Sequence, residues 1–198
     1  MSSGMDPHRI WFTADTHFGH RGIVNACNRP CGSVSEMDAM LIDNWNARVR
    51  PEHDVFHLGD FSFSRPDRTI EIIRALNGHI HLILGNHDHN NMNVSIHRYF
   101  EHVHDIRGIK VEDEDAGKRM GGRQFIELCH YPMVTWNRSH YGAWMLHGHS
   151  HGNLKEDPHA YRLDVGVDAW GYAPVSYWGI KQRMAMKLGF AAVDHHGS

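Results

Sequence analysis

The sequence predicts one α/β domain whose first half forms a parallel sheet and whose second half is richer in strands. Over residues 10–88, apolar runs alternate with helical patterns, which favours parallel strands joined by right-handed crossovers. After residue 100, strand-like segments follow one another without long helices, which favours an antiparallel or mixed sheet. The 198 residues suffice for one substantial core, so we expect a single domain over residues 1–198 with its core at about 9–188.

Three apolar runs stopped by polar residues or glycine are the expected strands of the first half: Ile10–Ala14, Val55–Leu58 and Ile80–Leu84. The helix between the first two strands is expected to start at a capping box, Ser33 to Glu36, and to stop at Pro51. The next helix is expected to start at Ser64, with Pro66 in its first turn. At the end of the third strand, Gly85 is expected to let the chain turn sharply.

The second half is expected to contain four strands and one short helix. The predicted strands are Val103–Val111, Arg123–His130, Ala143–His147 and Tyr161–Val167. The charged connection between the first two, which includes Glu112–Asp115, reads as a solvated hairpin tip. A C-terminal helix is expected from Ser176, although Gly179 and Gly189 weaken its pattern.

Composition describes an ordinary globular protein. The formal charge of -3 provides no overall field that would attract polyanions, so nucleic acid is neither implied nor excluded as a partner. The cysteines Cys27, Cys31 and Cys129 read as reduced thiols, and the Cys27–Cys31 pair is a weak metal-binding signal. Neither export nor membrane insertion is indicated, because the first residues are polar and no apolar run reaches 18 residues. A cytoplasmic protein is therefore expected.

The unusual number is 20 histidines, the side chain that most often binds metals and that titrates nearest neutral pH. Two of them, His57 and His147, lie inside strand runs and are expected to be core residues. Nine others have polar surroundings and are expected at the surface: His8, His53, His97, His102, His104, His140, His159, His195 and His196.

The remaining polar residues of interest each follow a predicted strand: Asp15, His17, Asp60, Asn86, His87, Asp88, His130, His149 and His151. Residues two apart after a strand are expected to point the same way, and Gly148 beside His149 permits close backbone approach. Carboxylate, amide and imidazole ligands without thiolates suit Mn, Fe, Zn, Ni or Co. Seven of these residues, all except His87 and Asp88, are candidate ligands, and that is more than one tetrahedral ion can bind. Two ions about 3.5–4 Å apart are therefore expected.

The ordered series Asp15-x-His17, Gly59-Asp60, Gly85-Asn86-His87-Asp88, His130 and Gly148-His149-x-His151 resembles the calcineurin-like metallophosphoesterase superfamily over residues 10 to about 168. Three further tripeptides resemble its small bacterial and phage branch: Phe18-Gly19-His20, Asn28-Arg29-Pro30 and Asn44-Trp45-Asn46. The resemblance implies an α/β/β/α sandwich of two β-sheets flanked by helices. It implies one metal on Asp15, His17, Asp60 and His151, and a second on Asp60, Asn86, His130 and His149, with Asp60 as the bridge.

The resemblance further implies a hydrolase for phosphomonoesters or phosphodiesters, with Mn as the first-choice ion and a metal-bridging hydroxide as the nucleophile. His87, oriented by Asp88, is expected to stabilise the phosphoryl group and protonate the leaving oxygen. His20 is an alternative acid or a phosphate contact, with capping or packing as its competing role. Arg29 is expected either to contact a substrate phosphate or to pin the loop before Pro30.

Three alternatives stay open. A catalytically inactive binding scaffold is disfavoured because every expected ligand position is filled. A single-strand nuclease would use the same site with a basic hairpin containing Lys118, Arg119 and Arg123, although the neighbouring acidic residues oppose this. The run His147-x-His149-x-His151 superficially resembles a β-lactamase-like metallohydrolase, but that family needs Asp-His directly after the second histidine, and Ser150-His151 does not supply it. The tryptophans Trp45 and Trp136 read as core or groove walls rather than base-stacking platforms.

Overall fold

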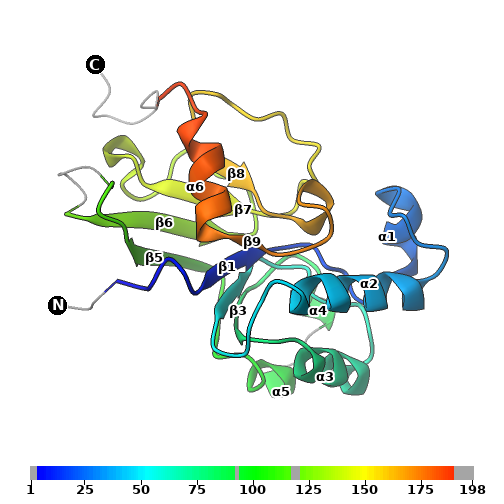
Figure 1. Ribbon diagram of the computed structural model, residues 1–198. Coiled ribbons are helices and arrows are strands. Elements are labelled where there is room, and N and C mark those ends of the chain that lie inside the picture. The colour runs from blue at the N-terminus through cyan, green and yellow to red at the C-terminus, as the bar shows by residue number, and fades with distance from the viewer. Residues whose placement is uncertain (1–3, 92–93, 117–120, 190–198) are drawn as a thin grey trace.

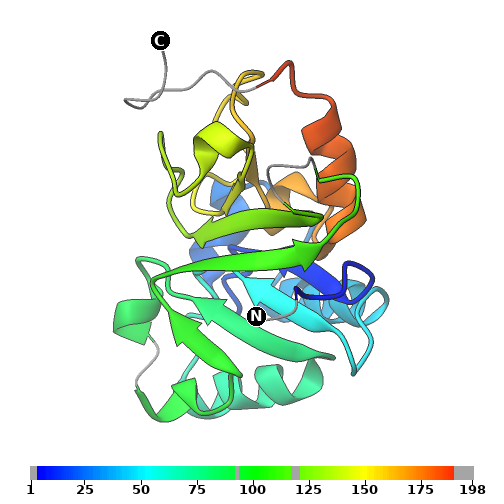
Figure 2. The ribbon, with the colours of Figure 1, turned by 90° about the vertical axis from the view of Figure 1, so that its left-hand side faces the viewer.

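The computed structural model describes residues 4–91, 94–116 and 121–189, which form two mixed β-sheets flanked by helices (Figure 1). This arrangement confirms the predicted α/β class. The two sheets pack face to face, and their facing side chains form one apolar cluster that includes Phe12, Phe56, Ile126 and Leu146. Figure 2 shows the hairpin of β5 (Ile106–Glu112) and β6 (Arg123–Cys129) stacked over the strands of the first sheet, with α3 (Pro66–Ala75) beneath them.

The first sheet has the strand order β4-β3-β2-β1-β9. Its strands are β1 (Ile10–Thr13), β2 (Asp54–His57), β3 (His79–Ile83), β4 (His102–His104) and β9 (Val175–Ser176). The three predicted strands β1, β2 and β3 are parallel, as expected. Strand β4, which was not expected in this sheet, is parallel to β3, and β9 runs antiparallel to β1. The sequence did not predict β9, because a two-residue strand has no detectable alternation.

The second sheet has the order β5-β6-β7-β8 and is mixed, as predicted. Its strands are β5 (Ile106–Glu112), β6 (Arg123–Cys129), β7 (Trp144–His147) and β8 (Arg162–Asp164). The β5–β6 hairpin is antiparallel, and the other pairs are parallel. The prediction of one strand over Val103–Val111 was wrong. The chain leaves the first sheet after His104 and enters the second at Ile106. Only Asp105 lies between the two strands, and no Gly or Pro marks the break in the sequence.

Two capping predictions are confirmed and one was wrong. The helix α2 (Val34–Asn46) begins after Ser33, whose Oγ accepts the N–H of Glu36, and it ends before Pro51 is reached. The helix α6 (Tyr177–Ala185) begins after Ser176, whose Oγ accepts the N–H of Gly179. The helix α3 (Pro66–Ala75) has the expected proline in its first turn, but Arg65 and not Ser64 precedes it, without a side-chain cap.

The helices cover the sandwich on different sides. Residues of α2 and α3 share an apolar cluster with the outer face of the first sheet, in which Trp45 is buried and donates Nε1–H to the Asn77 carbonyl. Helix α6 contacts β1 and β9 of the first sheet and β8 of the second, so it closes the side where these edges meet. Short helices α1 (Arg21–Ala26), α4 (Asp88–Asn91) and α5 (Val94–His97) lie in connections.

The expectations for the histidines and tryptophans divide as follows. His57 and His147 are buried, and Trp136 is a buried residue that donates to the Ala143 carbonyl, as expected. Of the nine expected surface histidines, four are half-buried because neighbouring side chains cover them: His53, His97, His104 and His140. His8, His102 and His159 are exposed, and His195 and His196 lie outside the described residues. No helix among the described residues is long and apolar enough to cross a membrane.

Candidate metal centre

The predicted ligands lie together where the carboxyl ends of strands from both sheets meet. Asp15, Asp60 and Asn86 follow β1, β2 and β3, whereas His130 and His149 follow β6 and β7. The Asn86 Oδ1 atom lies 3.0 Å from His130 Nε2 and 3.1 Å from His149 Nδ1, so residues carried by separate sheets meet at one oxygen. The predicted grouping of these positions is confirmed.

The Asp60 carboxylate lies at the centre of the cluster and is 2% exposed. Its Oδ2 atom lies 3.6 Å from His17 Nε2 and 3.6 Å from His130 Nε2. Three sets of described side chains could hold an ion: Asp15, His17 and His151; Asp15, Asp60 and His130; and Cys27, His151 and Asp168. Asp15 belongs to the first two sets, whereas the sequence suggested only Asp60 as a shared residue.

The residues fit a divalent cation. Both ring nitrogens of buried His17 lack a hydrogen-bond partner among the described residues, which is costly unless another ligand takes their place. Burial, followed by the charges of His151 and Arg29, lowers the pKa of His17 to about 2, so the imidazole is neutral and able to bind metal. Burial also raises the pKa of the Asp15 carboxyl well above its usual range. A bound cation would relieve that penalty.

A left-handed backbone, and not strand alternation, makes the side chains converge. Five of the candidate ligands have positive φ angles: Asp15 (56°), His17 (51°), Asp60 (56°), His149 (66°) and His151 (47°). Such conformations are uncommon outside glycine and cluster at functional sites. The expectation that residues two apart would converge because of the strand period was therefore wrong in its reason. Asp15 and His17 do share one possible ion-binding set, whereas His149 contacts Asn86 and His151 contacts Asp168.

Glycines allow the strand ends to approach the ligands closely. A Cβ at Gly85 would lie 2.3 Å from Asp60 Oδ1, and one at Gly148 would lie 2.8 Å from Asp15 Oδ2. A Cβ at Gly166 would lie 2.7 Å from the same Asp15 oxygen. The close approach predicted at Gly148 is confirmed. Gly85 is needed because a side chain would not fit beside Asp60. Its φ angle is not positive, so the sharp turn that the sequence predicted at this glycine is not the reason.

Arg29 does not face a substrate. Its guanidinium is buried and forms a two-pronged ion pair with Asp168, with N–O distances of 2.9 Å from both Nε and Nη2. It also donates to the carbonyls of Asp15 and Thr16 at 2.7 and 2.8 Å. The expected substrate contact was therefore wrong, and the alternative role of pinning a loop is correct, because all of these donors are used inside the protein.

Asp88 does not orient His87. Its carboxylate accepts three backbone N–H groups, from Asp60 at 2.7 Å, Gly85 at 2.8 Å and Phe61 at 2.9 Å. Burial raises the pKa of Asp88 to about 6, although these N–H groups favour the charged form. The predicted pairing with the adjacent histidine was wrong because the residue starts α4 and points back into the loop after β2.

His87 and His20 line the open side of the cluster. The His87 side chain is 45% exposed, and its Nε2 lies 3.9 Å from Asp60 Oδ2. The His20 ring stacks on Phe63 at 4.0 Å between centroids and lies 5.5 Å from the His17 ring. Burial lowers the pKa of His20. Both histidines are thus near the candidate ligands, and His20 also has the packing contact that was its competing role.

Sequence reasoning missed Asp168, the residue that pairs with Arg29. Its Oδ2 lies 2.7 Å from His151 Nδ1, which orients a candidate ligand. Burial acts against the charged form of His151, but this hydrogen bond raises its pKa above the ordinary value. Asp168 follows the predicted strand Tyr161–Val167, so the same signal that found the other strand-end residues could have found it.

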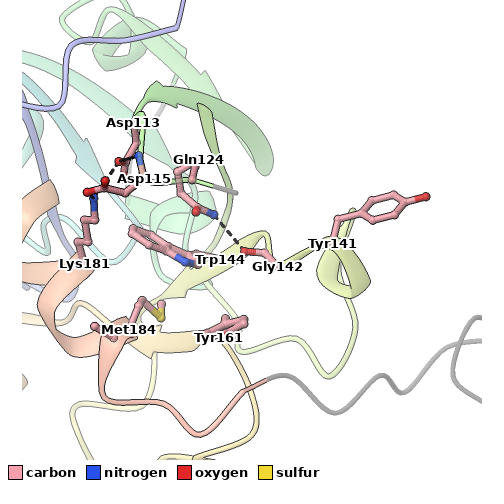
Figure 3. A pocket seen from close by; sticks show the side chains of 11 residues that line it. Asp113, Asp115, Gln124, Tyr141, Gly142, Trp144, Tyr161, Lys181 and Met184 are labelled. Carbon is pink, nitrogen blue, oxygen red and sulfur yellow. Dashed lines mark hydrogen bonds and ion pairs between the residues drawn. The ribbon is translucent and has the colours of Figure 1, made fainter. Parts of the chain in front are cut away.

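A separate pocket of about 290 Å³ lies at the other end of β6 and β7 (Figure 3). Gln124 and Trp144, at the starts of these strands, line it, whereas the metal ligands follow their ends. Its acidic residues Asp113 and Asp115 both accept from Lys181, at 2.8 and 2.9 Å. Lys118 and Arg119 of the expected basic hairpin lie outside the described residues. In the described part of the hairpin, Arg123 pairs with the acidic residue Glu112 across the two strands.

Comparisons with known proteins place the chain in a family. No protein-family model matches it. Over 179 residues it is 32% identical to the uncharacterized protein MJ1445 of Methanocaldococcus jannaschii, covering 87% of this chain and 89% of that protein. The chain belongs to the MJ1445 family.

Other relatives of this MJ1445-family chain are phage proteins. The gene 66 protein of Mycobacterium phage L5 is 32% identical over 185 residues, covering 81% of this chain and 87% of the phage protein. The gene 66 protein of Mycobacterium phage D29 is 26% identical over 182 residues. A solved structure, the protein of unknown function AQ665 from Aquifex aeolicus, matches with a TM-score of 0.65 and 24% identity over 88% of this chain and 98% of that chain. That likeness shows a shared fold.

Proposed function

We propose that this MJ1445-family protein is a phosphoester hydrolase of the calcineurin-like metallophosphoesterase type, with two divalent transition metal ions. The observation that carries the proposal is the position of Asp60. Its buried Oδ2 atom lies 3.6 Å from the Nε2 atom of His17, which follows a strand of the first sheet. It also lies 3.6 Å from the Nε2 atom of His130, which follows a strand of the second sheet. A carboxylate between two sets of ligands is the arrangement that a pair of ions requires.

The residues would divide between the two ions as the sequence motifs suggest. Asp15, His17 and His151 would hold the first, Asn86, His130 and His149 the second, and Asp60 both. Mn is the first ion to test, followed by Fe, Zn, Ni and Co, because the ligands are oxygen and imidazole nitrogen atoms. When bound, such a pair polarises phosphoryl oxygens and lowers the pKa of a shared water from about 15.7 towards 7.

The chain supplies the proton transfer. His87 would donate a proton to the departing oxygen, because its side chain is half exposed beside Asp60, whereas the proposed ligands Asp15, His17, Asp60 and His130 are buried. His20 is the second choice, since its ring is held flat against Phe63. Asp88 acts on neither histidine. It holds the backbone N–H groups of Asp60 and Phe61, and so keeps the shared ligand in place.

The experiment that tests the proposal uses metal-depleted protein reloaded with Mn. Hydrolysis is measured with p-nitrophenyl phosphate, its bis ester, cyclic nucleotides and single-stranded DNA, for the wild type and for Asp60→Asn and His87→Ala. We expect turnover of a small phosphoester by the wild type, with at least a hundredfold loss in either variant. Full activity in Asp60→Asn would contradict the proposal. Metal binding without turnover of any substrate would favour the inactive scaffold, and salt-sensitive cleavage of DNA alone would favour the nuclease.

A further inference from the structure

Asp168 connects Arg29 to a candidate ligand. It lies in a short 3-10 helix, Val167–Ala169, just after β8, and its side chain is 7% exposed. Its carboxylate accepts from His151 Nδ1 at 2.7 Å and from Arg29 Nε and Nη2 at 2.9 Å each. Charge-assisted bonds of this kind are short and directional, so both oxygens are committed.

The Asp168 carboxylate determines which nitrogen of His151 can bind an ion. An ionised carboxylate only accepts hydrogen bonds, so Nδ1 must carry the proton. Only Nε2 can then offer a lone pair. The ring of His151 stacks on that of His17 at 5.2 Å and 23°, and the two residues belong to the same possible ion-binding set with Asp15. The ring therefore lies beside the other ligands of the first ion while Nδ1 is held by Asp168.

Arg29 extends the same connection to the loop after β1. While it holds Asp168, it also donates to the carbonyls of Asp15 and Thr16. That loop contains two of the left-handed residues, Asp15 and His17, whose conformation costs free energy and persists only when other contacts hold it. One guanidinium thus joins the loop of Asp15 and His17 to the residue that holds His151.

We propose that Asp168 is a positioning residue for the metal centre, which holds His151 with Nε2 toward the ion, and that Arg29 fixes Asp168 and the Asp15–Thr16 backbone in the matching position. This inference rests on the proposed metal centre but not on phosphoester hydrolysis. Partners of this kind orient metal-binding histidines, and their loss commonly weakens metal affinity by about 10–100-fold.

The test compares two buried carboxylates with similar partners. Asp168→Asn keeps the size of the side chain but cannot accept from three donors. Asp113→Asn is the matched control, since Asp113 is also buried, accepts from Lys181 and Tyr177, and lines the pocket at the other end of the sheet. Mn and Zn affinities are measured by competition with a chelating dye, and unfolding is followed in the metal-free proteins. We expect about 10–100-fold weaker binding in Asp168→Asn and unchanged binding in Asp113→Asn, with comparable loss of stability.

A second measurement uses the wild type alone and does not depend on the variant folding. In protein labelled with ¹⁵N at histidine, the Nδ1–H of His151 is expected to be protected from exchange. Metal binding is expected to change the ¹⁵N chemical shift of Nε2. In the binding measurement described above, Asp168→Glu, which restores the carboxylate, should recover part of the metal affinity lost in Asp168→Asn. Coordination through Nδ1 in the wild type would overturn the inference.

The outcomes separate this inference from the proposed function. If Asp168→Asn binds metal as tightly as the wild type while His151→Ala does not, the inference is wrong. It is also wrong if the wild type binds no divalent ion, a result that removes the metal centre itself. If the affinities change as expected but no phosphoester is hydrolysed, the inference stands and the proposed function fails.

Discussion

Asp88 accepts the backbone N–H of Asp60 at 2.7 Å, so the loop that carries the central carboxylate is held by a residue 28 positions later. The same carboxylate accepts from Gly85 and Phe61. The ends of β2 and β3 are therefore joined at the point where both deliver residues to the cluster. These contacts predict a structural role for Asp88.

We expect Asp88→Asn to lower the free energy of unfolding by about 1–3 kcal/mol, because the new amide NH₂ group would face a backbone N–H and leave a buried donor unpaired. Urea denaturation of the metal-free proteins measures the change. His87→Ala is the control, and its midpoint should stay close to that of the wild type because the side chain is 45% exposed. Equal midpoints for the two variants would contradict the role given to Asp88.

Gly166→Ala tests the close packing around Asp15. The backbone at Gly166, with φ of -57° and ψ of 143°, suits alanine, so the effect would come only from the added methyl group. That group would lie 2.7 Å from Asp15 Oδ2 and displace it. We expect at least tenfold weaker metal binding, measured by chelator competition. Gly108→Ala in β5 is the control, since its nearest neighbour would be 3.6 Å away, and unchanged binding is expected there.

His57 predicts a dependence of stability on pH. Burial, followed by the charge of His130, lowers its pKa to about 3, against about 6.5 in the unfolded chain. Between these values the unfolded state binds more protons, so this contribution is complete above pH 6.5 and is lost as the pH falls towards 3. In metal-free protein, His57→Gln should therefore reduce the slope of unfolding free energy against pH by up to about 1.4 kcal/mol per unit. An unchanged slope in His57→Gln would contradict this role of the buried imidazole.

Metal removal should lower the melting temperature of the wild type, and the size of this effect should depend on the side chains that bind the metal. An ion that binds only the folded state at 100 times its dissociation constant adds about 2.7 kcal/mol. The melting temperature of the wild type should therefore fall on treatment with a chelator and recover with Mn. Asp60→Asn should show a much smaller response to both steps. Identical responses in the two proteins would remove Asp60 from the metal centre.

The strand-end residues of the site could be predicted from the sequence because each follows an apolar run that is local in the chain. Asp15, Asp60, Asn86, His130 and His149 were found in this way. The convergence of Asp15, Asp60 and Asn86 follows from the parallel strands of the first sheet, which end at one edge, as the alternation of strands and helices predicts. The approach of His130 and His149 depends on how the second sheet packs against the first.

The partners of Arg29 and Asp88 could not be predicted, because they depend on contacts between distant segments. Arg29 meets Asp168 across 139 positions, and no local pattern distinguishes a guanidinium that binds a carboxylate inside the protein from one that meets a substrate. Asp88 adjoins His87 in sequence, yet the start of α4 turns its side chain towards β2. The crossing at Asp105 had no Gly or Pro to mark it, so one predicted strand proved to be two.

The pairing of β9 with β1 has a consequence for synthesis of the protein. Trp11 pairs with Ser176, and Tyr177 and Ile180 of α6 share the apolar cluster of Phe12. A chain emerging from the ribosome therefore cannot complete the first sheet, or cover its edge, until residues 175–185 have been made. Because loop closure over so long a segment costs entropy before the contacts repay it, the step that completes this sheet is expected to be slow.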